Sequence, residues 1–344
     1  MNNSDDILQY YTPITLSKKR LDGYLAAGWF RSGAMLFRAK ITCFENNLYT
    51  PINVRIRLTD YVMSRSQQKL YNRNSRLFRF EVRKATITEE KERLFSGQQQ
   101  RFRSFLNNSL EEFMSMSHRF DTHEVAVYDE DRLVAVSFFD IGHNSIMSLL
   151  GLFDQSYSKY SLGIYTMLVE MQYAKEAGMQ WYYPGYVHEV PSIYDYKLKL
   201  GRCQIFDWDT RRWNYGVEPT QFTTQALDIK LKISKLTEHL TQKNVKHTTK
   251  IYIYFGWPYY NPNFFYLVKY PILVLLNDGR VLSYDYELDK YVCVRLELYL
   301  LLRDINMVFA PDFDHRLHLT DAMQIAETLF ETTSTKRLVD YVLK

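Results

Sequence analysis

A loop that runs directly into a helix is the first place where the residue types in this sequence could do chemistry. Residues 157–163 (YSKYSLG) precede a segment with helical apolar spacing. Backbone N–H groups at a helix N-terminus have no intrahelical acceptor, so they bind anions and developing negative charge. Ser161 is the expected N-cap; a direct hydrogen bond from its hydroxyl to a ligand is the alternative. The loop is typical of a cradle for an anionic or ester-bearing ligand, as an acyl-transfer site requires.

Three elements must position this loop. An apolar run over residues 145–153 predicts a strand that leads into it. Apolar residues then recur at helical spacing until Gly178, which predicts one helix with a buried stripe made of Ile164, Met167, Leu168, Met171 and Ala174. A short strand over residues 180–183 follows, and Pro184-Gly185 predicts a break or bulge in it.

The order of elements upstream of the loop indicates the fold class. Residues 125–141 have the pattern of an antiparallel hairpin, and residues 142–144 form a second turn into the strand at 145–153. The order strand, turn, strand, turn, strand, loop, helix, strand is that of the GNAT acyltransferase core. We predict an α+β protein with a mixed, mostly antiparallel sheet and a crossover helix. The sequence contains no dinucleotide-binding fingerprint and no GxxxxGK phosphate loop.

Positive charge is concentrated in one part of the chain. The whole protein carries only +4, but residues 51–103 contain thirteen Lys and Arg against five Asp and Glu. Such asymmetry favours a polyanionic partner, RNA above all, although a solvated basic face explains it as well. A helix predicted to begin near Ser64 or Ser66 carries the cations best placed for phosphate contacts: Arg65, Lys69, Arg73 and Arg76.

Cysteine usage and hydropathy exclude several classes of protein. The three cysteines are far apart with no CxxC pair, which excludes a zinc or iron–sulfur knuckle built from neighbouring cysteines and argues against a disulfide scaffold. The polar, acidic N-terminus does not have the pattern of a signal peptide, and no apolar run is long enough to span a membrane. We therefore expect a cytoplasmic protein without a membrane partner.

A change in composition after Trp213 predicts a domain boundary near Val217. Residues 1–216 would then hold an N-terminal region and the GNAT-like core, and residues 217–344 a C-terminal α+β domain whose role the sequence does not indicate. Within that domain, Asn277-Asp278-Gly279 predicts a hairpin turn. A closing amphipathic helix is expected over about residues 319–343.

Four segments of the first 213 residues resemble the arginyl-tRNA–protein transferase family. They are GWFRSGAMLFR (28–38), the PxxVR strand followed by SRSQQKLYNRN (51–74), the segment from residue 153 to 187 with its YSLG turn and following helix and strand, and YDYKLKLGRCQIFDWDTRRW (194–213). The last two together are the most specific, because both order and spacing match. The resemblance covers more than half of the chain.

The resemblance implies transfer of an amino acid, arginine or leucine, from charged tRNA to the α-amine of a protein N-terminus. Charged tRNA and protein or peptide N-termini are the implied partners, and no cofactor or metal is expected. Three features depart from the family, the first being that residues 188–192 lack the cysteine-basic pattern that the family has before its YK pair. Only Cys43 lies where the family has a cysteine cluster, and Pro184-Gly185-Tyr186 stands where the family has LGY.

An aminoacyl ester is already activated, so its transfer needs orientation, proton removal and oxyanion stabilisation rather than a metal or a covalent nucleophile. The predicted catalytic residues are Tyr186, Asp195, Tyr196 and Lys197. The tyrosines either pack in the cleft or take part in stacking or proton transfer, and Asp195 is a candidate base. Lys197 pairs either with the carboxylate of an acidic N-terminal residue or with a surface partner. The predicted substrate-binding residues are Tyr160, Ser161, Leu162, Gly163 and Gly185.

Two other functions stay open at this point. An acyl-CoA-dependent N-acyltransferase of the same fold would use acetyl-CoA as donor, but such enzymes have a glycine-richer loop, and residues 157–163 contain one glycine. A non-catalytic RNA-binding or protein-binding module on the same scaffold is the other alternative.

Overall fold

The computed structural model describes residues 7–44, 46–99, 109–114, 119–222, 224–260, 264–299 and 314–344. The chain forms two compact units. The core unit contains residues 11–38 and 51–222, and the C-terminal unit contains residues 1–10, 39–50 and 223–344. We predicted a single boundary between residues 216 and 217; the C-terminal unit here also takes in two segments from the first fifty residues.

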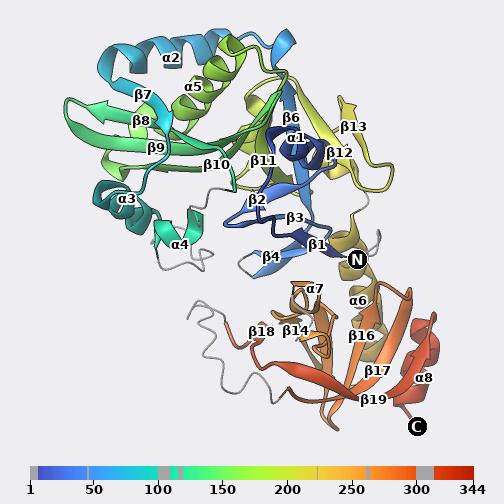
Figure 1. The fold of residues 1–344 in the computed structure, drawn as a ribbon. Coiled ribbons are helices and arrows are strands. Elements are labelled where there is room, and N and C mark those ends of the chain that lie inside the picture. Colours follow the sequence, from blue (N-terminus) through green and yellow to red (C-terminus); the bar gives the residue numbers. More distant parts are fainter. Residues whose placement is uncertain are drawn as a thin grey trace. The chain divides into compact units, whose positions relative to one another are not determined.

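An eight-stranded sheet forms the centre of the core unit (Figure 1). Six of its seven strand pairs are antiparallel, and only β10 and β11 run parallel. The spatial order of the strands is β13 (Arg212–Tyr215), β12 (Cys203–Asp207), β6 (Pro51–Arg57), β11 (Trp181–His188), β10 (Ser145–Phe153), β9 (Arg132–Ile141), β8 (Thr122–Asp129) and β7 (Arg79–Lys84).

Helices cover both faces of this sheet. Helices α2 (Arg65–Leu77) and α5 (Leu162–Glu176) lie on one face, where α5 packs on β9 and β10. The opposite face is covered by α1 (Lys18–Ala26), the β2–β3 hairpin (Phe30–Ser32 and Met35–Ala39), α3 (Glu89–Gln99) and α4 (Leu110–Met114). Short 3₁₀ turns connect the elements: η1 (Leu58–Asp60), η2 (Gln155–Tyr160), η3 (Asp195–Lys199) and η4 (Pro219–Gln221).

The α+β, GNAT-like core predicted from the sequence is confirmed. Antiparallel strands β8, β9 and β10 are followed by the crossover helix α5, which returns the chain to β11, parallel to β10. A crossover connection is what a parallel neighbour requires, since two parallel strands cannot be joined by a tight turn. The predicted bulge at Pro184-Gly185 is also present, but β11 continues through it to His188 rather than ending at residue 183.

The C-terminal unit has its own six-stranded mixed sheet and its own apolar core. The sheet order is β18 (His318–Leu319), β14 (His247–Tyr252), β15 (Ile272–Leu276), β16 (Arg280–Asp285), β17 (Lys290–Leu298) and β19 (Met323–Thr332). The predicted Asp-Gly turn joins β15 to β16, with Gly279 at φ 81°. The remaining elements are β1 (Leu8–Tyr11), β4 (Thr42–Phe44), β5 (Asn47–Tyr49), α6 (Gln225–Gln242), α7 (Trp257–Tyr260) and α8 (Thr335–Val342).

The closing helix predicted over residues 319–343 is wrong in its first part. Residues 323–332 form β19, which pairs antiparallel with β17, and only residues 335–342 are helical. Pairing with a strand more than twenty residues upstream overrides the local helical spacing of the segment, and no local pattern reveals such pairing.

A buried ion pair holds the β2–β3 hairpin against the sheet. Arg31 Nη1 donates to Asp140 Oδ1 at 2.7 Å, and the two side chains are 2% and 0% exposed. Thr122 Oγ1 donates to the same oxygen at 2.6 Å. Removing the charge of Asp140 would leave a buried guanidinium without a counterion, which typically costs about 3–5 kcal/mol.

We therefore expect Asp140→Asn to destabilise the core unit by about 3 kcal/mol. Urea denaturation followed by tryptophan fluorescence measures this change. The exposed pair of Arg57 and Asp60, 3.8 Å apart, is the control: Asp60→Asn should change stability by less than about 1 kcal/mol. Equal effects of the two substitutions would contradict the assignment of Asp140.

Candidate active site

Strands β10 and β11 separate after a short stretch of pairing. Only three residue pairs join them, from Ser145–Trp181 to Met147–Tyr183. Beyond these pairs β10 continues along β9 to Phe153, and β11 continues along β6 to His188. Each strand has a register shift where the separation begins, between Ser148 and Leu150 in β10 and between Tyr182 and Gly185 in β11. Beyond Met147 and Tyr183 the two strands therefore no longer pair with each other. A ligand can bind to the backbone groups that face this gap.

Lys197 lies beside the bulge of β11. Its side chain comes from η3, and its Nζ donates to the carbonyl oxygen of Tyr186 at 2.9 Å. The residue is 8% exposed and forms no ion pair with a carboxylate among the residues described. Burial without a counterion lowers the pKa of the Lys197 amine from 10.5 to about 7. A carboxylate placed beside this amine would raise its pKa again and hold it in the charged form.

Aromatic rings surround the Lys197 amine. The Nζ atom is 5.2 Å from the ring centroid of Tyr186 and 4.7 Å from that of Tyr194. Tyr186 also stacks on His188 and contacts Tyr194, and burial raises the pKa of the Tyr186 hydroxyl. The faces of aromatic rings attract a cation but do not neutralise its charge. The rings therefore do not replace a counterion, and an anionic group could still pair with the Lys197 amine.

Gly185 is required for this geometry. Its φ of +96° is unfavourable for a residue with a side chain, and a Cβ atom there would lie 3.2 Å from Lys197 Nζ.

We expect Gly185→Ala to destabilise the core unit by about 1–3 kcal/mol and to displace the Lys197 amine, because the added methyl group would be strained in this backbone conformation and would contact the amine. Chemical denaturation and a pH titration of the Lys197 amine by NMR measure the two effects. Gly151→Ala in β10 is the control, because a Cβ atom at residue 151 would meet only open space. Equal destabilisation by both substitutions would contradict the role of Gly185.

Asp195, the predicted base, is engaged within its own turn. Its two carboxylate oxygens accept from the backbone N–H and the hydroxyl of Ser192, each at 3.1 Å. These bonds order the segment that leads into η3 and so help to place Lys197. Tyr196, the residue between Asp195 and Lys197, is 39% exposed as a whole, and burial of its hydroxyl raises the pKa of that group to about 12.

Glu170 is a buried carboxyl that was not among the residues selected from the sequence. It lies on α5 and is fully buried, and its Oε2 accepts from the hydroxyl of Tyr182 at 2.7 Å. Burial raises the pKa of Glu170 to about 7, although the nearby hydroxyls of Ser137, Tyr182 and Ser148 act in the opposite direction. The sequence did contain a sign of this burial. Residue 170 falls within the apolar stripe between Met167 and Ala174, where a glutamate side chain would not reach solvent.

The loop before α5 differs from the prediction at Ser161. This residue is left-handed, with φ 54° and ψ 46°, and its side chain makes no capping hydrogen bond. Ser161 is thus the N-cap residue of α5 by position, as predicted, and its carbonyl accepts from the Tyr165 N–H at 3.0 Å, but its hydroxyl does not cap the helix. The neighbouring carbonyl of Tyr160 instead accepts from Asn74 Nδ2 at 2.8 Å and from Arg73 Nη2 at 3.0 Å, which fixes the loop to α2. The side chain of Leu162 is fully buried in the core, so only the backbone of this residue can contact a ligand.

Helix α2 begins at the predicted place and presents cations to solvent. Ser64 is its N-cap in a capping box with Gln67. Arg65, Lys69 and Arg76 are exposed, and Arg73 is exposed but bonded to Tyr160. The predicted site residues therefore form two groups: Gly185, Tyr186, Asp195, Tyr196 and Lys197 around the β11 bulge, and α2 with residues 160–163 at the start of α5.

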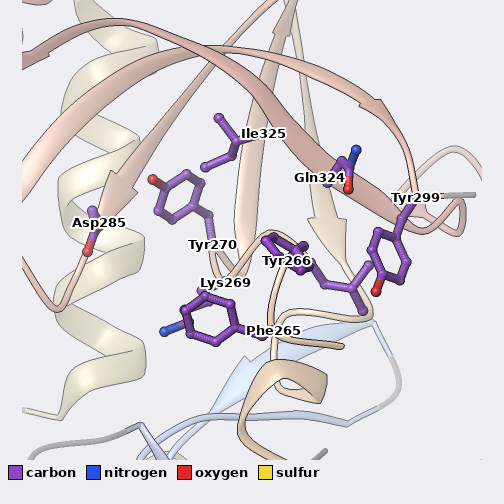
Figure 2. Close-up of a pocket in the computed structure, with 9 residues that line it drawn as sticks. Phe265, Tyr266, Lys269, Tyr270, Asp285, Tyr299, Gln324 and Ile325 are labelled. Atoms are coloured by element: carbon purple, nitrogen blue, oxygen red, sulfur yellow. The ribbon is translucent and has the colours of Figure 1, made fainter. Parts of the chain in front are cut away.

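The C-terminal unit contains a separate cavity of about 620 Å³ (Figure 2). Its rim includes the exposed rings of Phe265 and Tyr266, and Lys269 in it pairs with Glu287 at 3.4 Å. None of the predicted site residues lines it. Among the residues described, no group of His, Cys, Asp and Glu side chains is arranged to hold a metal ion. Across the same residues, no helix is both long and apolar enough to cross a bilayer.

Known proteins are similar in sequence to the part of the chain that builds this site. Residues 67–207 match the family described as "Arginine-tRNA-protein transferase, C terminus". An "Aspartate/glutamate leucyltransferase" of Leptospira interrogans is 27% identical over 207 residues, which cover 58% of this chain and 79% of the relative. The protein of the same name from Helicobacter hepaticus is 24% identical over 194 residues, covering 54% and 78% of the two chains.

A solved structure, "GCN5-related N-acetyltransferase from Kribbella flavida", covers 44% of this chain and 52% of that chain. Its sequence identity is 15% and its TM-score is 0.27. The fold assignment therefore rests on the strand order and register of the core unit itself.

Proposed function

We propose that this protein transfers an amino acid from charged tRNA to the α-amine of an N-terminal aspartate or glutamate, and the match of residues 67–207 to the family described as "Arginine-tRNA-protein transferase, C terminus" supports this reading. The relatives' name, aspartate/glutamate leucyltransferase, makes leucine the first donor to consider and arginine the second. The observation that carries the proposal is the buried Lys197 amine, which has no carboxylate partner among the residues described and lies at the gap between β10 and β11.

The acceptor side of the proposal follows from the charge of Lys197. A buried ammonium without a counterion is unfavourable, and an incoming carboxylate relieves this cost by forming a charge-assisted hydrogen bond. Aspartate and glutamate side chains supply such a carboxylate, whereas asparagine and glutamine do not. The site would reject the amide analogues because they leave Lys197 without a counterion, and an unpaired buried polar group discriminates strongly.

The donor side uses the start of α5 and the basic helix α2. The first N–H groups of α5, at Leu162 and Gly163, have no acceptor within the helix, so they can stabilise the oxyanion or the terminal phosphate. Exposed Arg65, Lys69 and Arg76 can contact phosphates further along the tRNA. We propose no cofactor, since the aminoacyl ester already carries the activation that the reaction needs.

The reaction that this site supports is a direct aminolysis. The lone pair of the acceptor amine attacks the ester carbonyl carbon and a tetrahedral oxyanion forms. The carbon–oxygen bond to the ribose then breaks, the amide bond remains, and the ribose hydroxyl leaves with a proton. The protein's contribution is to orient the two reactants and to stabilise the developing charge.

A donor panel tests the proposal. The full chain is mixed with a peptide that begins with aspartate and with radiolabelled leucyl-tRNA, arginyl-tRNA or acetyl-CoA. We expect label in the peptide from an aminoacyl-tRNA and none from acetyl-CoA. Label from acetyl-CoA alone would support the N-acyltransferase alternative. Absence of label with a full set of charged tRNAs, together with retained RNA binding, would support a non-catalytic module and overturn the proposal.

A further inference from the structure

Four of the five tryptophans lie in one network of rings and arginines in the core unit. Six residues form this tryptophan–arginine face: Trp29, Arg38, Arg55, Trp181, Trp208 and Trp213. We propose that the face binds unpaired nucleotides of an RNA strand, with bases stacked on its rings and phosphates paired with its guanidinium groups. Under the proposed aminoacyl transfer, on which the identity of the RNA rests, the strand belongs to the donor tRNA.

Arg55 lies over two of the indole rings. Its Cζ atom is 3.8 Å from the ring centroid of Trp181 and 4.3 Å from that of Trp213. Its Nε donates to Gln204 Oε1 at 2.6 Å, and no carboxylate forms an ion pair with Arg55 among the residues described. The rings stabilise this cation without neutralising its charge, so a phosphate can still pair with it.

Arg38 lies over the other two rings. Its Cζ atom is 5.2 Å from the ring centroid of Trp29 and 5.4 Å from that of Trp208. Burial and, to a lesser extent, the charge of Arg211 lower the pKa of Arg38 to about 10. The charged form of this side chain is thus destabilised by its surroundings, and an anionic group beside it would favour that form.

The rings are held in place by the rest of the core unit. The ring centroid of Phe206 lies 5.6 Å from that of Trp208 and 5.1 Å from that of Trp213, which joins the two arginine stacks. Trp213 Nε1 donates to the carbonyl oxygen of Ala26 at 2.8 Å, at the end of α1, and Figure 1 shows α1 beside β12 and β13. Trp208 Nε1 donates to the carbonyl oxygen of Pro51 at 3.3 Å. Because both indole N–H groups are bonded to backbone, these partly exposed side chains present ring surface to a ligand, and any base can stack on such a surface.

Further cations border the face at β12 and β13. Arg202 and Arg212 are exposed, and neither forms an ion pair with a carboxylate in the part of the chain that the structure describes. In the turn between the two strands, the carboxylate of Asp207 accepts from two backbone N–H groups, and Asp209 is exposed. Arginines therefore outnumber aspartates here, which favours a polyanionic ligand.

The tryptophan–arginine face is continuous with the candidate active site. Trp181 begins β11, within the short stretch that still pairs with β10. The ring centroid of Trp213 lies 5.8 Å from that of Tyr183, the last residue of β11 to pair before the strands separate. Tyr186, whose carbonyl oxygen accepts from Lys197, packs against the same apolar cluster as these rings.

The combination of rings and cations distinguishes unpaired RNA from other polyanions. In a duplex, the flat faces of the bases are covered by neighbouring bases. An acidic protein segment supplies negative charge but no flat rings. A single strand supplies phosphates together with free base faces, so it is the ligand that uses both parts of the tryptophan–arginine face.

Binding of a fluorescently labelled single-stranded RNA of about 12 nucleotides to the full chain tests this proposal. We expect the strand to quench the intrinsic tryptophan fluorescence and Trp208→Leu to lower its affinity by about tenfold, through loss of one stacking ring. The double variant Arg202→Gln, Arg212→Gln changes only exposed side chains. It should lower the slope of log affinity against log salt by about 1.4, since each phosphate contact with a single strand contributes about 0.7.

The matched control, Arg295→Gln with Arg337→Gln, removes two exposed arginines of the C-terminal unit and should leave affinity and slope unchanged. Unchanged binding by both face variants, or equal affinity for a duplex RNA of the same length, would overturn the proposal. Displacement by polyglutamate as readily as by unlabelled RNA would overturn it in favour of an acidic protein partner. Strand binding is measured without transfer, so its failure in a protein that transfers amino acids refutes this face alone. Strand binding by a protein that transfers nothing would instead refute the proposed function.

Discussion

Replacing Lys197 by methionine should lower transfer to a peptide that begins with aspartate by about 100-fold or more and should raise the stability of the core unit. The loss follows from the removal of the counterion for the acceptor carboxylate, because truncating one partner of a buried charge pair typically costs about 2–5 kcal/mol. Transfer to a peptide that begins with asparagine, slow in the wild-type protein, should change little. The rates of the two peptides, measured separately with each variant, give the comparison.

The stability gain follows from the pKa of Lys197, which is lowered from 10.5 to about 7 by burial. The unfolded chain binds this proton over a range in which the folded chain does not, so burial of Lys197 costs most below pH 7 and progressively less as the pH rises toward 10.5. Methionine has a similar length and no charge, so it avoids this cost. The increase in melting temperature should therefore be larger at pH 6 than at pH 9.

Lys197→Arg is the matched control. Arginine keeps the charge but does not fit the cage of Tyr186 and Tyr194 in the same way, so it should retain preference for aspartate with a reduced rate. If Lys197→Met slows the aspartate and asparagine peptides by the same factor, Lys197 is a general participant in the reaction and not the acidic-residue selector. Lower stability of the methionine variant at pH 6 would contradict the assignment of an uncompensated buried ammonium.

Reversing the charges on α2 should weaken tRNA binding without affecting the chemical step. In the variant Arg65→Glu, Lys69→Glu, Arg76→Glu, three exposed cations that can contact phosphates become repulsive. Each lost phosphate contact lowers the slope of log affinity against log salt by about 1, so the slope should fall by about 3. The single-turnover rate at saturating charged tRNA should stay within about twofold of the wild-type rate, because these residues act on binding alone.

Arg73 was left out of this variant because it also fixes the loop at Tyr160. The matched control reverses three exposed lysines of the C-terminal unit, Lys235, Lys243 and Lys246. Filter binding or fluorescence anisotropy over a range of salt concentrations measures both variants. An unchanged slope for the α2 variant, or an equal change in the control, would show that α2 is a solvated face and not the tRNA contact.

The sequence predicted the elements of the core unit well where local signals are strong. The antiparallel hairpin over residues 125–141, the helix start near Ser64 and the helix stop near Gly178 all correspond to structure. Ser161 is the N-cap residue as predicted, but its left-handed backbone and the absence of a capping bond from its hydroxyl were not predicted. The adjoining carbonyl of Tyr160 is held by Asn74 and Arg73. Contacts from a distant helix cannot be seen in the loop's own sequence.

The site itself was predictable only in part. The family-like segment directed attention to Lys197, but its burial and its lack of a described carboxylate partner depend on the turn at η3 and the bulge of β11. Glu170 required knowledge of which helix face is buried, and α5 is buried over most of its circumference. β19 shows the same limit in the C-terminal unit, since long-range pairing with β17 decides its conformation.

The most direct test of the central claim is single-turnover transfer from radiolabelled leucyl-tRNA and arginyl-tRNA to four peptides that differ only in the first residue: aspartate, glutamate, asparagine or glutamine. We predict label in the aspartate and glutamate peptides, with rates at least about 100-fold above those of their amides, and loss of this difference in Lys197→Met. Equal labelling of acids and amides by the wild-type protein, or labelling of none with either tRNA, would contradict the claim.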